Sequence, residues 1–184
     1  EDYEGAEAQV LMIGFSRMGQ IASQALLAGG CDVTILDNDA ERIRQARRFG
    51  FRIYFGDGTR RDVLRAAGIE HANIVAVCTG HKNITDEIVD LIASEFPHAK
   101  MYVRSYDRIH TLELRQRDIS WEIRETFESA MVLGHALLQG IGIPSVEADH
   151  ILDDIRRRDS ERLKMQMQDG ITAGHDHLHT EPVT

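Results

Sequence analysis

The chain has 184 residues, of which 42% are hydrophobic and 28% are charged, a balance that is ordinary for a soluble globular protein. That length suffices for one sizeable α/β domain with an appendage and is marginal for two full domains. The formal net charge of −9 argues against nucleic acid as a partner, because phosphate binding needs a cationic face. No apolar run approaches the roughly 18 residues of a membrane-spanning helix, so we expect that this chain does not cross a bilayer by itself.

The N-terminal segment and the cysteines bear on where the protein is located in the cell. Residues 1–8 are acidic and lack the basic and apolar regions of a signal peptide, so we expect a linker there, in a fragment of a larger protein. Cys31 and Cys78 form no Cys-x-x-Cys pair, which indicates a reducing compartment rather than a disulfide framework.

Strand and helix patterns alternate regularly over the first hundred residues. Short apolar runs predict five buried strands, at residues 9–13, 33–36, 52–55, 74–78 and 101–104. Amphipathic spacing and caps predict the helices between them, at residues 18–28, from Asn38 or Asp39 to 48, from Thr59 to 67, and 83–96. In the third helix, Thr59 and Asp62 are expected to form a capping box. Together these elements predict an α/β fold with a doubly wound parallel sheet and right-handed crossovers.

The pattern weakens after residue 104. We expect a helix at 109–117, a short strand around Trp121, an apolar helix at 127–140 and a charged helix at 145–168 that lies across a partner surface. The histidines at 175, 177 and 179 are interpreted as part of a polar, disordered tail rather than as a metal site. The predicted organisation is a linker at 1–8, a nucleotide-binding domain at 9–142, a peripheral or dimer helix at 143–168 and a disordered tail at 169–184.

A strand, a glycine turn and a helix at residues 9–28 are typical of a Rossmann-type nucleotide site. The turn departs from Gly-x-Gly-x-x-Gly only at its middle glycine, where Ser16 stands, and this substitution favours a mononucleotide. Asp37 ends the second strand, where a carboxylate accepts ribose hydroxyls and repels a 2′-phosphate, so AMP or NAD is expected rather than NADP. An alternative is a degenerate fold whose crevice binds nothing. The residues predicted to bind the nucleotide are Gly14, Ser16, Arg17, Met18, Gly19, Asp37, Asp57 and Thr79.

No catalytic pattern accompanies this nucleotide signal. The histidines are scattered, no Ser-His-Asp order or metal-ligand pair occurs, and the glycine turn lacks the Walker lysine. We therefore expect a binding domain and not an enzyme, with an NAD-dependent oxidoreductase as the least favoured alternative.

Several motifs together resemble the RCK or KTN domain, the regulator of potassium conductance, over about residues 9–164. They are Ile13-Gly-Phe-Ser-Arg-Met-Gly-Gln20, Leu36-Asp37, Phe55-Gly-Asp-Gly-Thr-Arg60 and Tyr102-Val-Arg-Ser-Tyr-Asp107. The motifs Arg48-Phe-Gly50, Glu95-Phe-Pro-His98, Leu114-Arg-Gln116 and Arg124-Glu-Thr-Phe-Glu128 resemble the Kef branch, the bacterial glutathione-gated potassium efflux systems.

The resemblance implies a homodimeric control domain on the cytoplasmic side of the bacterial inner membrane, joined to a potassium/proton antiport domain in the same polypeptide. It implies that AMP or NAD occupies the crevice, that glutathione keeps efflux closed, and that glutathione adducts of electrophiles open it. An auxiliary oxidoreductase subunit is a further partner that the family allows. The alternative within the family is an RCK domain that senses NAD/NADH in a Trk-type potassium uptake system.

Glutathione carries two carboxylates and one ammonium group, so its site needs cations and polar groups. By resemblance, Arg124 is the leading carboxylate ligand, and Phe49 is a switch at the dimer interface that a bulky S-substituent displaces. The alternative for Phe49 is that it anchors its helix in the core. The remaining glutathione candidates are Gln20, Gln24, Arg104, Asp107 and Asp159, and the family often has Arg and Asn at the positions of Gln24 and Asp159.

Overall fold

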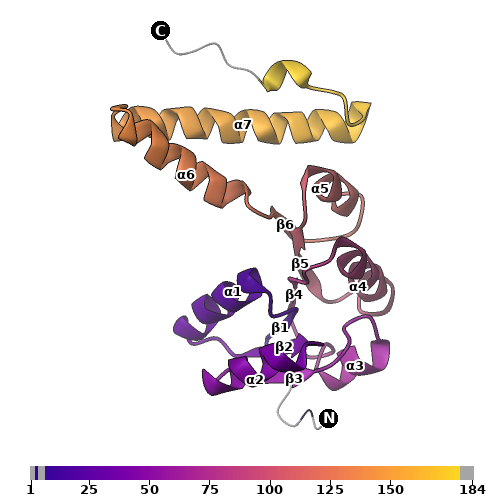
Figure 1. Cartoon of the computed structure of the whole chain (residues 1–184). Helices are drawn as coiled ribbons and strands as arrows, with labels where there is room; N and C mark the ends of the chain where they lie inside the picture. Colours follow the sequence, from indigo (N-terminus) through magenta and orange to yellow (C-terminus); the bar gives the residue numbers. More distant parts are fainter. Residues whose placement is uncertain (1–2, 4–6, 179–184) are drawn as a thin grey trace. The chain divides into compact units, whose positions relative to one another are not determined.

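A computed structural model describes residue 3 and residues 7–178 of the chain (Figure 1). The strands are β1 (Val10–Ile13), β2 (Val33–Asp37), β3 (Ile53–Phe55), β4 (Ile74–Val77), β5 (Lys100–Ser105) and β6 (Trp121–Arg124). The helices are α1 (Arg17–Ala28), α2 (Ala40–Arg48), α3 (Arg61–Ala66), α4 (Lys82–Glu95), α5 (Arg108–Leu114), α6 (Phe127–Gly140) and α7 (Ser145–Asp169), followed by the short 3₁₀ helix η1 (His175–His177). Each predicted strand and helix is present, with ends that differ by a few residues at most.

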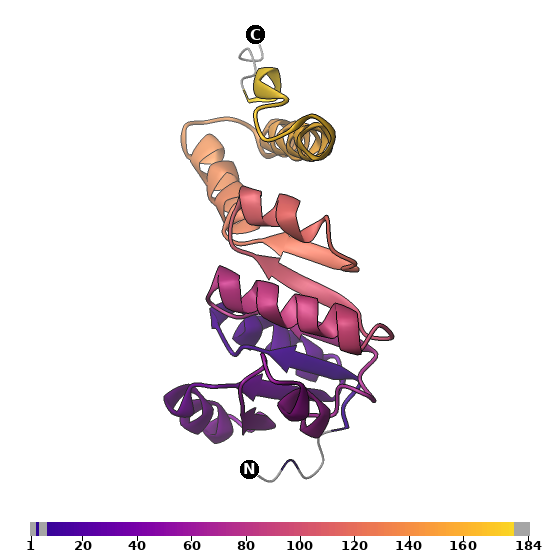
Figure 2. The ribbon, with the colours of Figure 1, turned by 90° about the vertical axis from the view of Figure 1, so that its right-hand side faces the viewer.

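The strands form one sheet in the order β3-β2-β1-β4-β5-β6. The pairs β1–β2, β1–β4, β2–β3 and β4–β5 are parallel, with Val10 opposite both Val33 and Ile74. The order reverses beside β1, and α1 and α2 lie on one face of the sheet while α3 and α4 lie on the other (Figure 1). Figure 2 looks onto the face that α3 and α4 cover. The predicted doubly wound α/β fold is therefore confirmed.

The core consists of two apolar clusters, one on each face of the sheet. Successive side chains of a strand point to opposite faces, so Leu11 and Ile13 join the cluster under α3 and α4. Val10 and Met12 join the cluster under α1 and α2. The unbroken apolar run of β1 is thus explained by burial on both sides of the sheet.

The described chain divides into two compact units. One contains the described residues up to 106 together with residues 113–123, and the other contains residues 107–112 and the described residues from 124 onward. In the second unit, α6 and α7 form a hairpin whose connection includes Gly142 at a φ of 99°, a conformation that favours glycine. Within this unit α6 packs with α7, and the domain boundary at residue 142 stays a prediction. Within the described residues, no helix combines the length and the apolar character that a bilayer span requires.

One local expectation differs from the structure. The capping box of α3 is absent, because the Thr59 amide and hydroxyl both donate to Asp57, at 2.9 and 2.7 Å, while Asp62 pairs with Arg60. After α7, turns and η1 continue the described chain as far as residue 178. His177 lies 3.6 Å from the Glu161 carboxylate, and His179 lies outside the described residues. No cluster of metal-ligating side chains occurs in the described ranges.

Candidate functional site

The first candidate site is a crevice at the carboxyl ends of β1, β2, β3 and β4, where the strand order reverses. Ligands of open α/β sheets bind at this position. Gly14 makes the close approach of β1 and β4 feasible, because a Cβ atom there would lie 2.7 Å from the Thr79 backbone nitrogen, and its φ is 93°. The side chains and backbone that line the crevice include Gly14, Asp37, Asn38, Arg42, Asp57, Gly58, Thr79 and His81.

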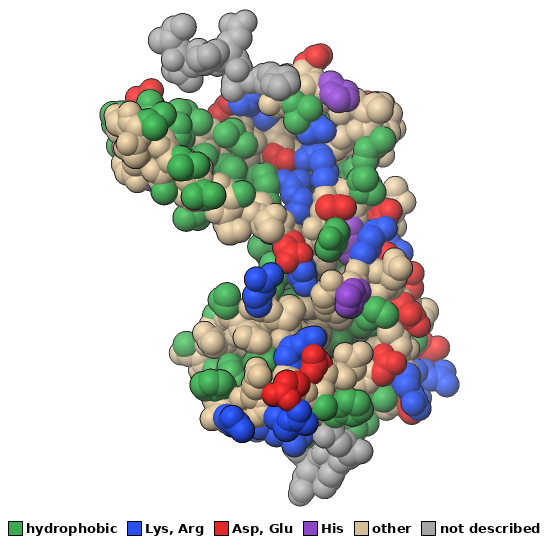
Figure 3. Space-filling model, viewed as in Figure 1, with side chains coloured by type: hydrophobic (Ala, Val, Ile, Leu, Met, Phe, Trp, Pro, Cys, Tyr) green, Lys and Arg blue, Asp and Glu red, His purple; other side chains and the backbone are tan. Residues whose placement is uncertain are grey.

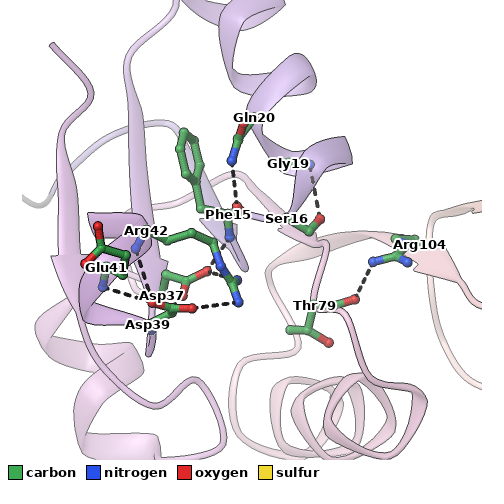
Figure 4. Close-up of polar contacts among 10 residues, drawn as sticks. All are labelled: Phe15, Ser16, Gly19, Gln20, Asp37, Asp39, Glu41, Arg42, Thr79 and Arg104. Carbon is green, nitrogen blue, oxygen red and sulfur yellow. Dashed lines mark hydrogen bonds and ion pairs between the residues drawn. The ribbon is translucent and has the colours of Figure 1, made fainter. Parts of the chain in front are cut away.

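The glycine turn, from Gly14 to Gly19, connects β1 to α1 as predicted from the sequence. A Cβ atom on Gly19 would lie 2.4 Å from the Gly14 carbonyl oxygen, so a side chain at that position would force α1 away from the turn. Ser16 is the N-cap of α1, and its hydroxyl accepts from the Gly19 amide at 3.4 Å (Figure 4). Arg17 is exposed, whereas the Met18 side chain lines an apolar surface of the sheet and not the crevice. Met18 could therefore reach a nucleotide only through its backbone.

Asp37 is buried and accepts three hydrogen bonds within the described chain. Its Oδ2 accepts from the Phe15 amide at 2.6 Å and from Arg42 Nη1 at 3.0 Å, and its Oδ1 accepts from the Asp39 amide at 2.7 Å (Figure 4). Asp39 caps α2, and the backbone N–H of Arg42 holds the pKa of the Asp39 carboxyl below its usual value. Arg42 was not among the predicted site residues, although it lies in the first turn of α2, the helix that follows Asp37.

The size of the crevice bears on which nucleotide it fits. Its volume of about 180 Å³ is small beside the roughly 300 Å³ at the lower end of ligand pockets. Asp37, Asp57 and Thr79 are among the polar residues that line this small crevice.

A second cavity of about 470 Å³ lies between α1 and α2. Gln20 and Gln24 project from α1 and Arg42 from α2, while Phe49 stands at the C-terminal end of α2 with 79% of its surface exposed. This exposure excludes the alternative in which Phe49 anchors its helix in the core. We call this cavity the α1–α2 pocket.

A third polar group lies in the other unit and is centred on Asp159 of α7. Arg108 Nη1 donates to Asp159 Oδ1 at 2.5 Å, and Arg124 Nη2 donates to Asp159 Oδ2 at 3.0 Å. The Arg124 guanidinium also lies over the Phe127 ring, 4.2 Å from its centroid. Burial is the main cause that lowers the pKa of Arg108 from its usual value. Sequence patterns could not indicate Arg108, because it meets an acid 51 residues away.

The predicted glutathione ligands thus fall into separate groups. Gln20 and Gln24 share the α1–α2 pocket with Phe49, while Arg124 and Asp159 pair with each other in the second unit. Arg104 donates to the Thr79 carbonyl oxygen at 2.8 Å, which ties β5 to the end of β4 (Figure 4). The Asp107 carboxylate accepts from the His110 amide at 2.8 Å at the start of α5, so a local structural role accounts for this residue.

Two exposed apolar surfaces complete the description. In the first unit, an apolar hollow of about 580 Å³ lies on the sheet beside α1 and includes Met18, Cys31, Tyr102 and Trp121. In the second unit, α6 exposes the apolar side chains Val132, Leu133 and Leu137, Ile141 at its C-terminal end is exposed too, and apolar atoms gather over this helix in Figure 3. Surfaces of this kind mark sites of protein–protein contact.

Comparisons with known proteins agree with this geometry. A family model of the TrkA-N domain matches residues 10–122. A glutathione-regulated potassium-efflux system protein of Haemophilus influenzae is 42% identical over 166 residues, which are 90% of this chain and 27% of that protein. The corresponding protein KefC of Klebsiella pneumoniae is 33% identical over 157 residues, which are 85% of this chain and 25% of that protein.

The solved structures include a Kef C-terminal domain of Shewanella denitrificans in an AMP bound form. It is 29% identical to this chain, with a TM-score of 0.79, and the match covers 86% of this chain and 96% of that domain. The chain spans about a quarter of the length of the curated relatives it matches. The chain belongs to the TrkA-N domain family, and within that family it resembles the C-terminal domain of Kef-type potassium efflux proteins.

Proposed function

We propose that this chain is the regulatory domain of a glutathione-gated potassium efflux system and acts by binding, not by catalysis. In this proposal it holds an adenine nucleotide in the crevice and glutathione at a separate site, and the identity of the glutathione species sets whether efflux is closed or open. The observation that carries the proposal is the exposed Phe49 at the edge of the α1–α2 pocket, which both amide and apolar side chains line, since an exposed aromatic there can sense the bulk of a ligand.

AMP is the nucleotide that we propose for the crevice. Asp37 accepts from ribose, Asp57 and Thr79 border the sugar and phosphate, and the amides at the start of α1 face the phosphate with the favourable end of the helix dipole. The small cavity and the AMP bound form of the Shewanella denitrificans domain support this choice over NAD. Bound AMP would stabilise the fold rather than react.

Glutathione would use cations for its carboxylates and amides for its peptide groups. Arg124 and Arg108 supply planar, charged donors of the kind that recognise carboxylates, while Gln20 and Gln24 supply uncharged donors and acceptors. A substituent on the glutathione sulfur would push against Phe49, whereas the free thiol would not. The switch would then be a difference in affinity for two arrangements of the domain.

We also propose a homodimer, which would cover an exposed apolar surface of each unit. The apolar hollow on the sheet and the apolar face of α6 are both exposed in the single chain, and pairing each with its counterpart on a second copy would cover them. We further propose that the chain works on the cytoplasmic side of the bacterial inner membrane, joined to an antiport domain in the same polypeptide. An auxiliary oxidoreductase subunit is a further partner that we propose from the resemblance to this family.

Calorimetry with glutathione and with S-hexylglutathione tests the proposal. We expect both to bind, and Arg124→Ala to weaken each by roughly ten- to a hundredfold, since hydrogen bonds to charged groups contribute about 1.5–3 kcal/mol. Arg156→Ala is the matched control, because Arg156 belongs to the same unit and, among the described residues, pairs only with the exposed carboxylates of Glu128 and Asp153. The proposal is wrong if neither compound binds, or if both variants behave alike. Tight NADH binding without glutathione binding would favour the Trk-type alternative instead.

A further inference from the structure

Arg42 stands on the wall between two cavities of the same unit. It lines the nucleotide crevice together with Asp37, and it lines the α1–α2 pocket together with Gln20, Gln24 and Phe49. Its side chain is partly exposed, and its guanidinium bridges two carboxylates, Asp37 at 3.0 Å and Asp39 at 3.1 Å (Figure 4). Arg42 is therefore placed so that one movement of its side chain alters both cavities.

The acceptor capacity of Asp37 determines when such a movement is required. An ionised carboxylate offers about four acceptor positions. Within the described chain three are taken, by the Phe15 amide, the Asp39 amide and Arg42. A ribose that donates both of its hydroxyls to Asp37 needs two acceptor positions on the carboxylate, but only about one is free. One of the three donors that now bind Asp37 must therefore give up its hydrogen bond.

The two backbone amides are fixed by the fold, because Phe15 belongs to the glycine turn and Asp39 caps α2. Arg42 is the only side-chain donor of the three, and its guanidinium can rotate while it keeps Asp39. The 2′,3′-diol of a nucleotide therefore displaces Arg42 from Asp37 and from no other partner. A nucleotide with a single ribose hydroxyl fills the remaining position without this displacement.

We propose that the ribose diol of AMP releases Arg42 from Asp37 toward the α1–α2 pocket, so that an occupied crevice raises the affinity of this pocket for an anionic ligand. The released guanidinium would turn its charge from Asp37 toward a pocket whose other described lining is amide, aromatic and aliphatic. By linkage, the anionic ligand raises the affinity for AMP by the same factor. The anionic ligand is glutathione, and this identification rests on the proposed function.

The experiment follows the Arg42 Nε–H signal by NMR and the affinities by calorimetry. AMP at saturation is expected to shift the Arg42 signal, while 2′-deoxy-AMP at saturation leaves it close to its position in the free protein. AMP is expected to raise glutathione affinity about fivefold or more, in the usual range of coupling between sites, and 2′-deoxy-AMP is expected to leave it unchanged.

Two variants separate this coupling from a general effect of charge on α2. Arg42→Gln should bind AMP and glutathione with no coupling between them. Arg44→Gln should keep the full coupling, because Arg44 is exposed and pairs with Glu41 on the far side of the helix from Asp37. An Arg42 signal that does not respond to AMP, or coupling that survives in Arg42→Gln, overturns the inference. A complete lack of glutathione binding would instead refute the proposed function, while the response of the Arg42 signal to AMP alone would still decide whether the release occurs.

Discussion

The Asp159→Asn variant tests the arginine cluster of the second unit. Asp159 has a side chain that is 19% exposed and accepts charged donors from Arg108 at 2.5 Å and Arg124 at 3.0 Å. Each such bond contributes about 1.5–3 kcal/mol, but the two are not additive because partly exposed arginines regain water when the carboxylate is removed. We expect a loss of about 2–3 kcal/mol in the free energy of unfolding. For a chain of this size that loss corresponds to a fall in Tm of roughly 4–12 °C.

The assay is urea unfolding at pH 7, with thermal unfolding in parallel, and Asp153→Asn as the matched control. Asp153 lies on the same helix, is 73% exposed and pairs with Arg156 three residues away, so its replacement should cost less than about 0.5 kcal/mol. Glutathione should stabilise Asp159→Asn more than it stabilises the wild type, because in the variant the glutathione carboxylate no longer competes with the Asp159 carboxylate for Arg108 and Arg124. The role given to Asp159 would be refuted if Asp159→Asn and Asp153→Asn were equally stable and if glutathione stabilised Asp159→Asn no more than the wild type.

Three further outcomes follow from side-chain environments. Asp37→Asn should weaken AMP binding about tenfold or more in calorimetry, since the ribose loses a charged acceptor; unchanged affinity would mean that the ribose lies elsewhere. Burial raises the pKa of the Cys78 thiol to about 11, so iodoacetamide at pH 8 should alkylate exposed Cys31 and spare Cys78 in the folded protein, as mass spectrometry of peptides can show. Phe49→Ala should change the free energy of unfolding by less than about 0.5 kcal/mol and yet reduce the discrimination between glutathione and S-hexylglutathione, whereas Ile43→Ala in the core of the same helix should cost about 2–5 kcal/mol. Equal costs for these two variants would contradict the exposure of Phe49.

The fold and the nucleotide crevice could be predicted from local patterns. Apolar runs, helical spacing and glycine turns act over a few neighbouring residues, and alternating strands and helices leave little choice but a parallel sheet. Parallel strands end at one edge, so the positions of Asp37, Asp57 and Thr79 at strand ends were enough to predict that they meet. Gly14 and Gly19 were predictable for the same reason, because their steric roles lie within one turn.

Other features depend on contacts between distant residues or on which face of an element is buried. Arg108 and Arg124 converge on Asp159 from 51 and 35 residues away, and no periodicity encodes that meeting. Met18 lies in the predicted turn, but the direction of α1 sends its side chain to the apolar sheet surface instead of the crevice. Arg42 has the spacing of an ordinary helix-surface arginine, and only the packing of α2 beside β2 places it between the crevice and the α1–α2 pocket. Periodic patterns in a sequence reflect interactions between residues that are close along the chain. The surroundings of these side chains depend instead on how whole helices and strands pack, so only the tertiary structure determines their chemical role.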